Sequence, residues 1–358
     1  MTPLDPVEVA TPALLVDLDR LSANIARMST RVRSQGLRLR PHAKTHKCVE
    51  IARLQVDAGA SGLTVATLSE AEVFASAGFD DLFVAYPILP VGAKAARLRS
   101  LLDRVSLSVG VDNVAGAVAL ARAAGGRPAR VVLEIDSGQH RTGVAPDSVV
   151  PLAEECRGLG LSVTGVFTHG GHSYRDPSAP ADAAADEGSA LTEAASRLSA
   201  AGFEVGVVSA GSTPTTGASR PTPVTEERPG SYVFYDRQQL ALGACSVDDV
   251  ALTVAATVVS TGHGRFVIDA GSKALASDRP AWLHGHGSVP ALGEAYVTSL
   301  SEHHGIVEGA SSLPAVGDLV QVVPNHVCTV VNLFDEYVAV RAGEVVDRWP
   351  VAARGRNV

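Results

Sequence analysis

The chain of 358 residues exceeds the length at which a single hydrophobic core usually suffices, so two domains are expected. Apolar residues make up 46% of it and charged residues 19%, the balance of a soluble globular protein. A net charge of −8, from 30 basic and 38 acidic residues, argues against nucleic acid and anionic membranes as partners.

Targeting signals are absent from the sequence pattern. Met1–Pro6 has neither the basic nor the apolar region of a signal peptide, and no apolar stretch approaches the ~20 residues of a membrane span. Cys48, Cys156, Cys245 and Cys328 lie far apart, without a Cys-x-x-Cys motif. Four cysteines could pair, but reduced thiols are favoured in a chain of this size with no signal-peptide pattern. We therefore expect a cytoplasmic protein.

Short apolar strands alternate with helical patterns up to residue 236. The strand candidates are 37–43, 62–66, 81–85, 105–109, 130–135, 163–167, 205–208 and 232–234. Helical stretches such as 69–77 and 113–123 separate most of them, and Ser69 followed by Glu72 has the spacing of a capping box. This alternation predicts an α/β fold with a parallel (β/α)8 TIM-type barrel over residues 19–236. A doubly wound open sheet is the alternative, although no Gly-x-Gly-x-x-Gly fingerprint follows the first strand.

The pattern changes from Leu240 onward. Short β-rich segments punctuated by Gly, Pro and Asp occur at 250–259, 265–269, 318–323, 329–333 and 337–341. Long amphipathic helices are missing from this part of the sequence, so residues 237–358 are predicted to form a separate C-terminal β domain.

Pro41-His42-Ala43-Lys44-Thr45-His46-Lys47 links the first strand candidate to a helical pattern. A lysine at the end of a strand lies where α/β barrels place catalytic groups. The neighbouring cations favour a lowered lysine pKa, and a neutral amine is what Schiff-base chemistry with a carbonyl or pyridoxal phosphate (PLP) requires. Taken alone, such a basic string is more typical of a surface turn.

With this motif the chain resembles the PLP-dependent family that contains D-serine dehydratase and D-threonine aldolase, relatives of alanine racemase. The resemblance extends from Thr11–Leu18 to Trp349–Gly355. It implies that Lys44 binds PLP covalently and that residues 1–18 join the β domain. It also implies a homodimer in which the β domain of one subunit helps to close the barrel of the other.

Two further motifs follow the fifth and sixth strand candidates. In Asp136–Gly143, the resemblance implies that Arg141 approaches the phenolic oxygen of PLP; by itself the motif is a glycine-containing turn. In Phe167–Tyr174, it implies that His169 lies near the pyridine ring. His172 or Tyr174 could supply an acid/base or stacking group, and a structural histidine is an equally good interpretation.

A phosphate site is predicted from two loops rich in glycine and hydroxyl groups. Backbone N–H donors and small hydroxyls can approach a phosphate closely, and barrels commonly bind phosphate with their seventh and eighth loops. The candidate residues are Gly211, Ser212, Thr213, Gly230, Ser231 and Tyr232.

His326 and Cys328 lie in the β domain, two residues apart in a segment expected to be a strand, so that their side chains would share a face. Imidazole and thiolate suit Zn²⁺, although a lone His-x-Cys is usually structural. The resemblance favours zinc here, with Mn²⁺ or Mg²⁺ as alternatives. It also favours the dehydratase branch, because the aldolases carry His-x-Asp. The doubled histidine His303-His304 departs from the Glu-His-Gly pattern of the family and has no assigned role.

The leading functional prediction is a PLP- and metal-dependent lyase acting on small D-amino acids with a β-hydroxyl group. A D-serine dehydratase-type elimination would give a keto acid and ammonia. D-threonine aldolase-type cleavage to glycine and an aldehyde is the nearest alternative, because a metal would hold the same hydroxyl. A racemase and a non-catalytic PLP carrier are more remote.

Overall fold

The computed structural model describes residues 9–216, 218 and 224–358. The chain divides into two compact units. The barrel unit comprises Met28–Lys44, Ala52–Gly230 and Gly355–Val358, and the β unit comprises Met1–Arg27, Thr45–Ile51 and Ser231–Arg354. The segment Met1–Pro6 lies outside the described residues. Among the helices that are described, none has both the length and the apolar character needed to cross a membrane.

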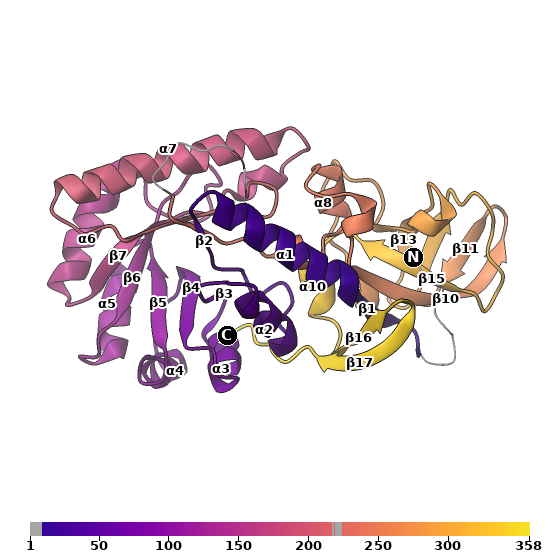
Figure 1. Ribbon diagram of the computed structural model, residues 1–358, viewed down its shortest axis with the longest axis horizontal. Helices are drawn as coiled ribbons and strands as arrows, with labels where there is room; N and C mark the ends of the chain where they lie inside the picture. The colour runs from indigo at the N-terminus through magenta and orange to yellow at the C-terminus, as the bar shows by residue number, and fades with distance from the viewer. Residues whose placement is uncertain (1–8, 217, 219–223) are drawn as a thin grey trace. The chain divides into compact units, whose positions relative to one another are not determined.

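The barrel unit is built on an eight-stranded sheet in the order β2-β9-β8-β7-β6-β5-β4-β3, with parallel pairing throughout (Figure 1). Its strands are β2 (Arg38–Leu39), β3 (Leu63–Val65), β4 (Asp81–Pro87), β5 (Ser106–Val111), β6 (Arg130–Glu134), β7 (Ser162–Phe167), β8 (Val207–Ala210) and β9 (Glu226–Glu227). A parallel bridge between His42 and Thr64 connects the chain after β2 to β3, so the two edges of the sheet meet. The predicted α/β barrel is confirmed.

Helices follow most of these strands and surround the sheet (Figure 1). They are α2 (Val49–Asp57), α3 (Leu68–Ser76), α4 (Ala93–Leu102), α5 (Val114–Ala124), α6 (Val149–Gly158) and α7 (Ala179–Ala200). The helix α1 (Leu18–Ser34) precedes β2 in the chain and is divided between the two units. α3 begins with an N-cap two residues before the predicted one, and the predicted capping box of Ser69 and Glu72 is not formed. Thr67 is the N-cap and accepts the N–H of Glu70, whose carboxylate accepts the N–H of Ala66. Ser69 instead donates its hydroxyl to Val358 O at 2.7 Å.

The predicted strand at 232–234 is wrong. The eighth strand is β9, and residues 231–233 form a short 3-10 helix, η3 (Ser231–Val233). Two consecutive glutamates give no apolar strand signal, yet both are buried. The cost of burying Glu226 is offset by an ion pair with Arg40 at 2.8 Å and a hydrogen bond from Ser209 at 2.7 Å. The apolar pattern at Tyr232 and Phe234 reflects their complete burial and not a strand.

The β unit contains a nine-stranded sheet in the order β11-β14-β13-β12-β15-β10-β1-β16-β17, in which β10 also pairs with β11. Its strands are β1 (Ala13–Asp17), β10 (Leu252–Gly262), β11 (Arg265–Ile268), β12 (Gly287–Ser288), β13 (Tyr296–Leu300), β14 (Gly305–Glu308), β15 (Leu319–Pro324), β16 (Glu336–Arg341) and β17 (Glu344–Pro350). β1 lies between β10 and β16, and its Leu14, Leu15 and Val16 are buried.

The predicted strand at 329–333 is also wrong. β15 ends at Pro324, and α10 (Val327–Val331) follows directly. The run of β-branched residues that suggested a strand is instead one buried side of this short helix, formed by Val327, Val330 and Val331. Two further short helices in the unit are α8 (Arg237–Ala241) and α9 (Ser272–Leu275).

Candidate functional site

Lys44 lies on a turn between the His42–Thr64 bridge and α2, and it is half-buried. This position is at the carboxyl end of the first barrel strand, where such barrels carry catalytic groups. Lys47 has a different environment in the β unit. It is buried, its Nζ donates to Ala353 O at 3.3 Å, and its carbonyl accepts the N–H of Ala353 at 2.9 Å. Of the two lysines, Lys44 therefore has the placement of a reactive amine.

His169 follows β7 and brings several predicted residues together. Burial holds the pKa of its imidazole well below the usual value, and the nearby charges of Lys44, Arg141 and Arg228 lower it further, as does His172. His169 is therefore a neutral imidazole among three cations, each of which follows a different barrel strand. A neutral ring can pack against or hydrogen-bond a cofactor without adding positive charge.

The loop that carries Arg141 is shaped by Asp136. Its carboxylate accepts the backbone N–H groups of Gly138 at 2.9 Å and His140 at 3.0 Å, and it pairs with His140 Nδ1 at 2.7 Å. These bonds hold the pKa of Asp136 below its usual value, although burial opposes them. Arg141 is exposed at the tip of this loop, as the glycine-containing turn predicted.

His172 lies on a short 3-10 helix, η2 (Gly171–Tyr174), together with Tyr174, which is half-buried. The Nε2 atom of His172 is 3.2 Å from Asp186 Oδ2, and its Nδ1 is buried with no hydrogen-bond partner among the described residues. The carboxylate of Asp186 fixes the orientation of the ring, which fits an acid/base group and a structural histidine equally.

Gly211 begins the predicted phosphate loop after β8. Ser212 and Thr213 are buried beside it, and the hydroxyl of Ser212 lies 3.1 Å from Thr215 Oγ1 and 3.3 Å from Ser173 Oγ. This cluster of hydroxyl groups suits a phosphate. The N–H of Gly211, however, donates to Glu187 Oε1 at 3.2 Å.

Glu187 on α7 is a residue that sequence reasoning missed. The same oxygen accepts the N–H of Gly170 at 2.9 Å, so one buried carboxylate anchors the loops after β7 and β8. Nothing in the helical pattern around Glu187 distinguishes it from the solvent-exposed glutamates of the chain.

Gly211→Ala is expected to lower the free energy of unfolding by about 1–3 kcal/mol more than Gly202→Ala does. Both glycines have positive φ, 91° and 80°, so both substitutions strain the backbone. Only at Gly211 would the added Cβ collide, with Glu227 Oε2, whereas Gly202 has open space. Urea unfolding of the two variants separates the collision from the strain. Equal losses of unfolding free energy in the two variants would show that the loop at Gly211 accommodates the added Cβ without a collision.

Gly230 ends the barrel unit, and Ser231 and Tyr232 begin the β unit. Ser231 and Tyr232 are buried, and both belong to η3 rather than to an extended loop before a strand. Their predicted role toward a phosphate stays a prediction.

Arg228 is a second residue that sequence reasoning missed, although it lies in the motif that supplied Gly230. It is buried, and its guanidinium donates to Ser209 Oγ and to Thr168 O, each at 2.5 Å. It also lies over the rings of Phe167 and Phe83, 5.3 and 5.8 Å from their centroids. Burial lowers its pKa, and surrounding glutamates oppose that effect. The guanidinium is thus a fixed charge held rigidly inside the barrel.

Glu134 at the end of β6 is buried, and burial raises its pKa to about 7. Its Oε1 accepts from Thr142 at 3.0 Å, and its Oε2 has no hydrogen-bond partner in the described part of the chain. The charges of Arg141 and Arg228 lower the pKa of Glu134, but by less than burial raises it. Glu134 therefore titrates near neutral pH.

The raised pKa of Glu134 predicts a loss of stability as the pH rises from 4.5 to about 7. Over this range the unfolded state releases the proton and the folded state keeps it, which costs about 3 kcal/mol when complete. Glu134→Gln should remove this loss. The free energy of unfolding of the variant relative to wild type should therefore increase between pH 4.5 and 7.5; a difference that does not change with pH would contradict the assignment.

His326 and Cys328 do not lie on a strand, contrary to the prediction. His326 is the N-cap of α10 and Cys328 lies in its first turn. Burial opposes the charged form of His326, but the nearby Cys328 and Asp236 raise its pKa well above the usual value. The Cys328 sulfur also contacts Thr45 Oγ1 at 3.2 Å, and His326 Nδ1 is 3.2 Å from Asp236 Oδ2. No group of three or more His, Cys, Asp or Glu side chains suited to a metal occurs among the described residues, so this pair offers two donors.

His303 and His304 lie apart from this pair in the fold, between β13 and β14. Both are exposed, and His303 Nε2 is 3.4 Å from Lys273 Nζ, which also pairs with Glu302 at 2.6 Å. These contacts belong to the exposed, charged surface at the turn between β13 and β14.

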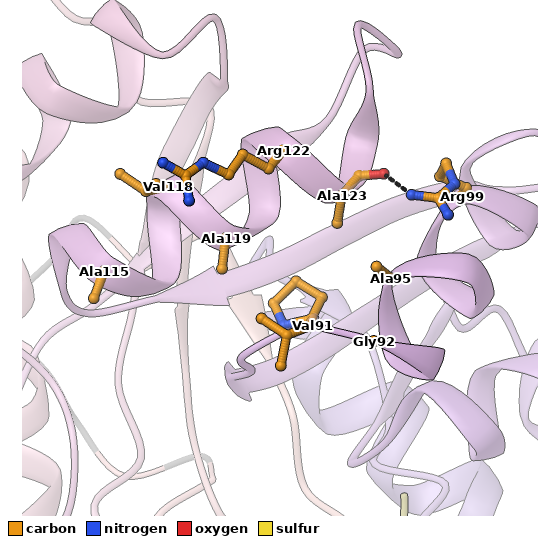
Figure 2. A pocket seen from close by; sticks show the side chains of 10 residues that line it. Val91, Gly92, Ala95, Arg99, Ala115, Val118, Ala119, Arg122 and Ala123 are labelled. Atoms are coloured by element: carbon orange, nitrogen blue, oxygen red, sulfur yellow. Dashed lines mark hydrogen bonds between the residues drawn. The ribbon is translucent and has the colours of Figure 1, made fainter.

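A surface groove of about 510 Å³ between α4 and α5 lies outside the candidate site (Figure 2). Apolar side chains such as Val91, Ala95 and Ala119 line it, and Arg99 on one wall donates to Ala123 O at 3.3 Å. None of the predicted site residues lines this groove.

The residues at the carboxyl ends of the barrel strands fit PLP. Lys44 supplies an amine, Arg141 and Arg228 supply fixed positive charge for an anionic cofactor, and His169 supplies a neutral ring. The buried hydroxyls near Ser212 suit its phosphate. The imidazole of His326 and the thiol of Cys328 are donor types that suit zinc.

The comparisons with known proteins identify the family. The chain matches the model for the alanine racemase N-terminal domain over residues 16–238 and that for a putative serine dehydratase domain over residues 251–340. It therefore belongs to the alanine racemase N-terminal domain family. The predicted family of PLP-dependent D-amino acid lyases is confirmed.

Relatives resemble the chain over nearly their whole length. D-threo-3-hydroxyaspartate dehydratase from Delftia sp. is 39% identical, over 95% of this chain and 96% of the relative. D-threonine aldolase from Arthrobacter sp. is 33% identical (99% and 95%), and D-serine dehydratase from Dictyostelium discoideum is 31% identical (91% and 92%). A solved structure of a D-threo-3-hydroxyaspartate dehydratase mutant in the metal-free form has a TM-score of 0.89 at 36% identity, covering 98% of this chain and 99% of that one.

Proposed function

We propose that this protein is a PLP- and metal-dependent lyase that eliminates water from small D-β-hydroxy amino acids, giving a keto acid and ammonia. The observation that carries the proposal is the neutral His169 among Lys44, Arg141 and Arg228 at the carboxyl ends of the barrel strands. The relatives named as dehydratases support the choice of reaction.

In this proposal Lys44 would hold the cofactor covalently through its Nζ, and the substrate amine would displace it. The freed Nζ would then be placed to accept the proton from the substrate Cα. Arg141 faces the phenolic oxygen and Arg228 provides further fixed positive charge, so that both stabilise anionic groups of the cofactor. His169 packs beside the pyridine ring, and His172, oriented by Asp186, exchanges protons through Nδ1. Ser212, Thr213 and Gly230, with Ser231 and Tyr232 of η3, would bind the phosphate. Bound PLP supplies a sink for the electron pair released at Cα, and bound metal supplies charge for the β-hydroxyl.

His326 and Cys328 hold the metal, and their donor atoms favour Zn²⁺ over Mn²⁺ or Mg²⁺. Thr45 supports a role in the same reaction, because it follows Lys44 in the chain and its Oγ1 contacts the Cys328 sulfur at 3.2 Å. A solved relative described in a metal-free form fits this assignment.

Aldol cleavage to glycine and an aldehyde is the second candidate, favoured by the match to D-threonine aldolase. In that reaction a base takes the hydroxyl proton and the Cα–H bond stays intact. Cys328 favours elimination, because the resemblance of the His-x-Cys motif is to the dehydratase branch. The remaining elements of the proposal are a cytoplasmic location and a homodimer. That the four described cysteines form no disulfide with one another fits this compartment.

Product analysis separates the two reactions. Purified protein with PLP and Zn²⁺ is incubated with D-serine, D-threonine or D-threo-3-hydroxyaspartate, and with each L-enantiomer as a control. Elimination predicts equal amounts of keto acid and ammonia from the D-substrates, without glycine. Glycine and aldehyde as main products would replace the proposal with the aldolase. Turnover of neither kind would contradict both.

A further inference from the structure

Asp236 is a fully buried carboxylate at the start of α8, within the β unit. Its Oδ1 accepts the backbone N–H of Gln239 at 2.9 Å, which caps the helix. This bond occupies Oδ1, and capping a helix in this way is an ordinary role for an aspartate.

The second oxygen faces the candidate metal pair. Oδ2 accepts the backbone N–H of Val327 at 3.0 Å and lies 3.2 Å from His326 Nδ1. A single carboxylate therefore holds both the side chain of His326 and the backbone that leads to Cys328. An ionised carboxylate only accepts hydrogen bonds, so His326 Nδ1 must carry a proton.

This arrangement determines which nitrogen can bind a metal. An imidazole whose Nδ1 donates to a carboxylate can bind a metal only through Nε2, and the contact with Asp236 also fixes the plane of the ring. Carboxylates that accept from a ligating histidine in this way orient the ring and raise its basicity.

We propose that Asp236 is a positioning residue for the metal site: it sets the tautomer and orientation of His326 so that Nε2 binds the metal beside the Cys328 sulfur. The inference rests on the proposed role of His326 and Cys328 as metal ligands. Asp236 itself touches neither metal nor substrate.

Asp236→Asn tests the proposal with almost no change in size. If the amide oxygen keeps the cap on Gln239, the NH₂ group faces His326 Nδ1 and the N–H of Val327, where only an acceptor fits. If the amide turns over, the NH₂ group faces the N–H of Gln239 instead. Either orientation loses hydrogen bonds that the carboxylate of Asp236 accepts. The first orientation also favours the tautomer of His326 that is protonated at Nε2. The Kd for Zn²⁺ is therefore expected to rise about 10- to 100-fold.

Zn²⁺ affinity is measured by competition with a chromophoric chelator, on metal-stripped protein that retains PLP. Asn113→Ala is the matched control, because Asn113 caps α5 in the barrel unit by accepting the N–H of Gly116 at 2.7 Å. It should lower the melting temperature and leave the Kd for Zn²⁺ within about twofold of wild type. PLP absorbance should persist in both variants.

The outcomes separate this inference from the proposed function. Wild type that binds no Zn²⁺ would refute the metal site itself. Tight binding by wild type and an unchanged Kd in Asp236→Asn would overturn the positioning role alone. Should Asp236→Asn fail to fold, ¹⁵N NMR of wild-type His326 decides: protonated Nδ1 and metal-bound Nε2 support the proposal, and the reverse tautomer overturns it.

Discussion

Lys44→Ala should reduce the rate of keto acid formation by at least about 10³-fold, because one amine provides both the covalent attachment and the proton-transfer base. The visible absorbance of covalently bound PLP should disappear as well. Steady-state kinetics and an absorbance spectrum of the same preparation measure both effects.

Lys47→Ala is the matched control in the same motif. Lys47 Nζ is bonded to Ala353 O, so its loss should reduce stability while the PLP spectrum and most of the activity remain. If Lys47→Ala abolished PLP binding and Lys44→Ala did not, the assignment of the two lysines would be reversed.

Cys328→Ala should reduce turnover by at least about 100-fold, since a bound metal is worth several kcal/mol to a charged transition state. Chelation of the wild-type protein should do the same. In both cases the PLP absorbance and the melting temperature should change little, because a closed structural zinc site needs four ligands and the proposed pair supplies two.

Added Zn²⁺ distinguishes loss of metal from loss of structure. It should restore chelated wild type fully and Cys328→Ala poorly. Full activity in metal-free wild type would refute the role of the metal. A metal found far from PLP would leave His326 and Cys328 as a structural pair.

Most barrel strands could be predicted from the sequence because their apolar residues are consecutive and buried, as in Leu82, Phe83 and Val84 of β4. β9 could not, since its two residues are glutamates whose burial depends on a distant arginine, Arg40. The opposite error occurred at 329–333, where a run of β-branched residues looked like a strand. Proline at 324 and the His326 cap end β15 and begin a helix instead.

The candidate site shows the same division. Lys44, Arg141 and His169 belong to local motifs and could be identified from a few neighbouring residues. Arg228 could not, because its guanidinium binds a carbonyl 60 positions away in the chain. Asp236 and His326 are separated by 90 positions, and an aspartate before a short helix looks like any N-cap. Residues whose roles depend on partners that are distant in the sequence can be identified only once the fold is known.

The central claim is that Lys44 binds PLP, and borohydride reduction followed by peptide mapping tests it most directly. Reduction traps the cofactor on the lysine to which it is attached, and mass spectrometry of the digest locates the added phosphopyridoxyl group. The label is predicted on the peptide that contains Lys44, at that residue. A label on Lys47 or Lys273 would contradict the account.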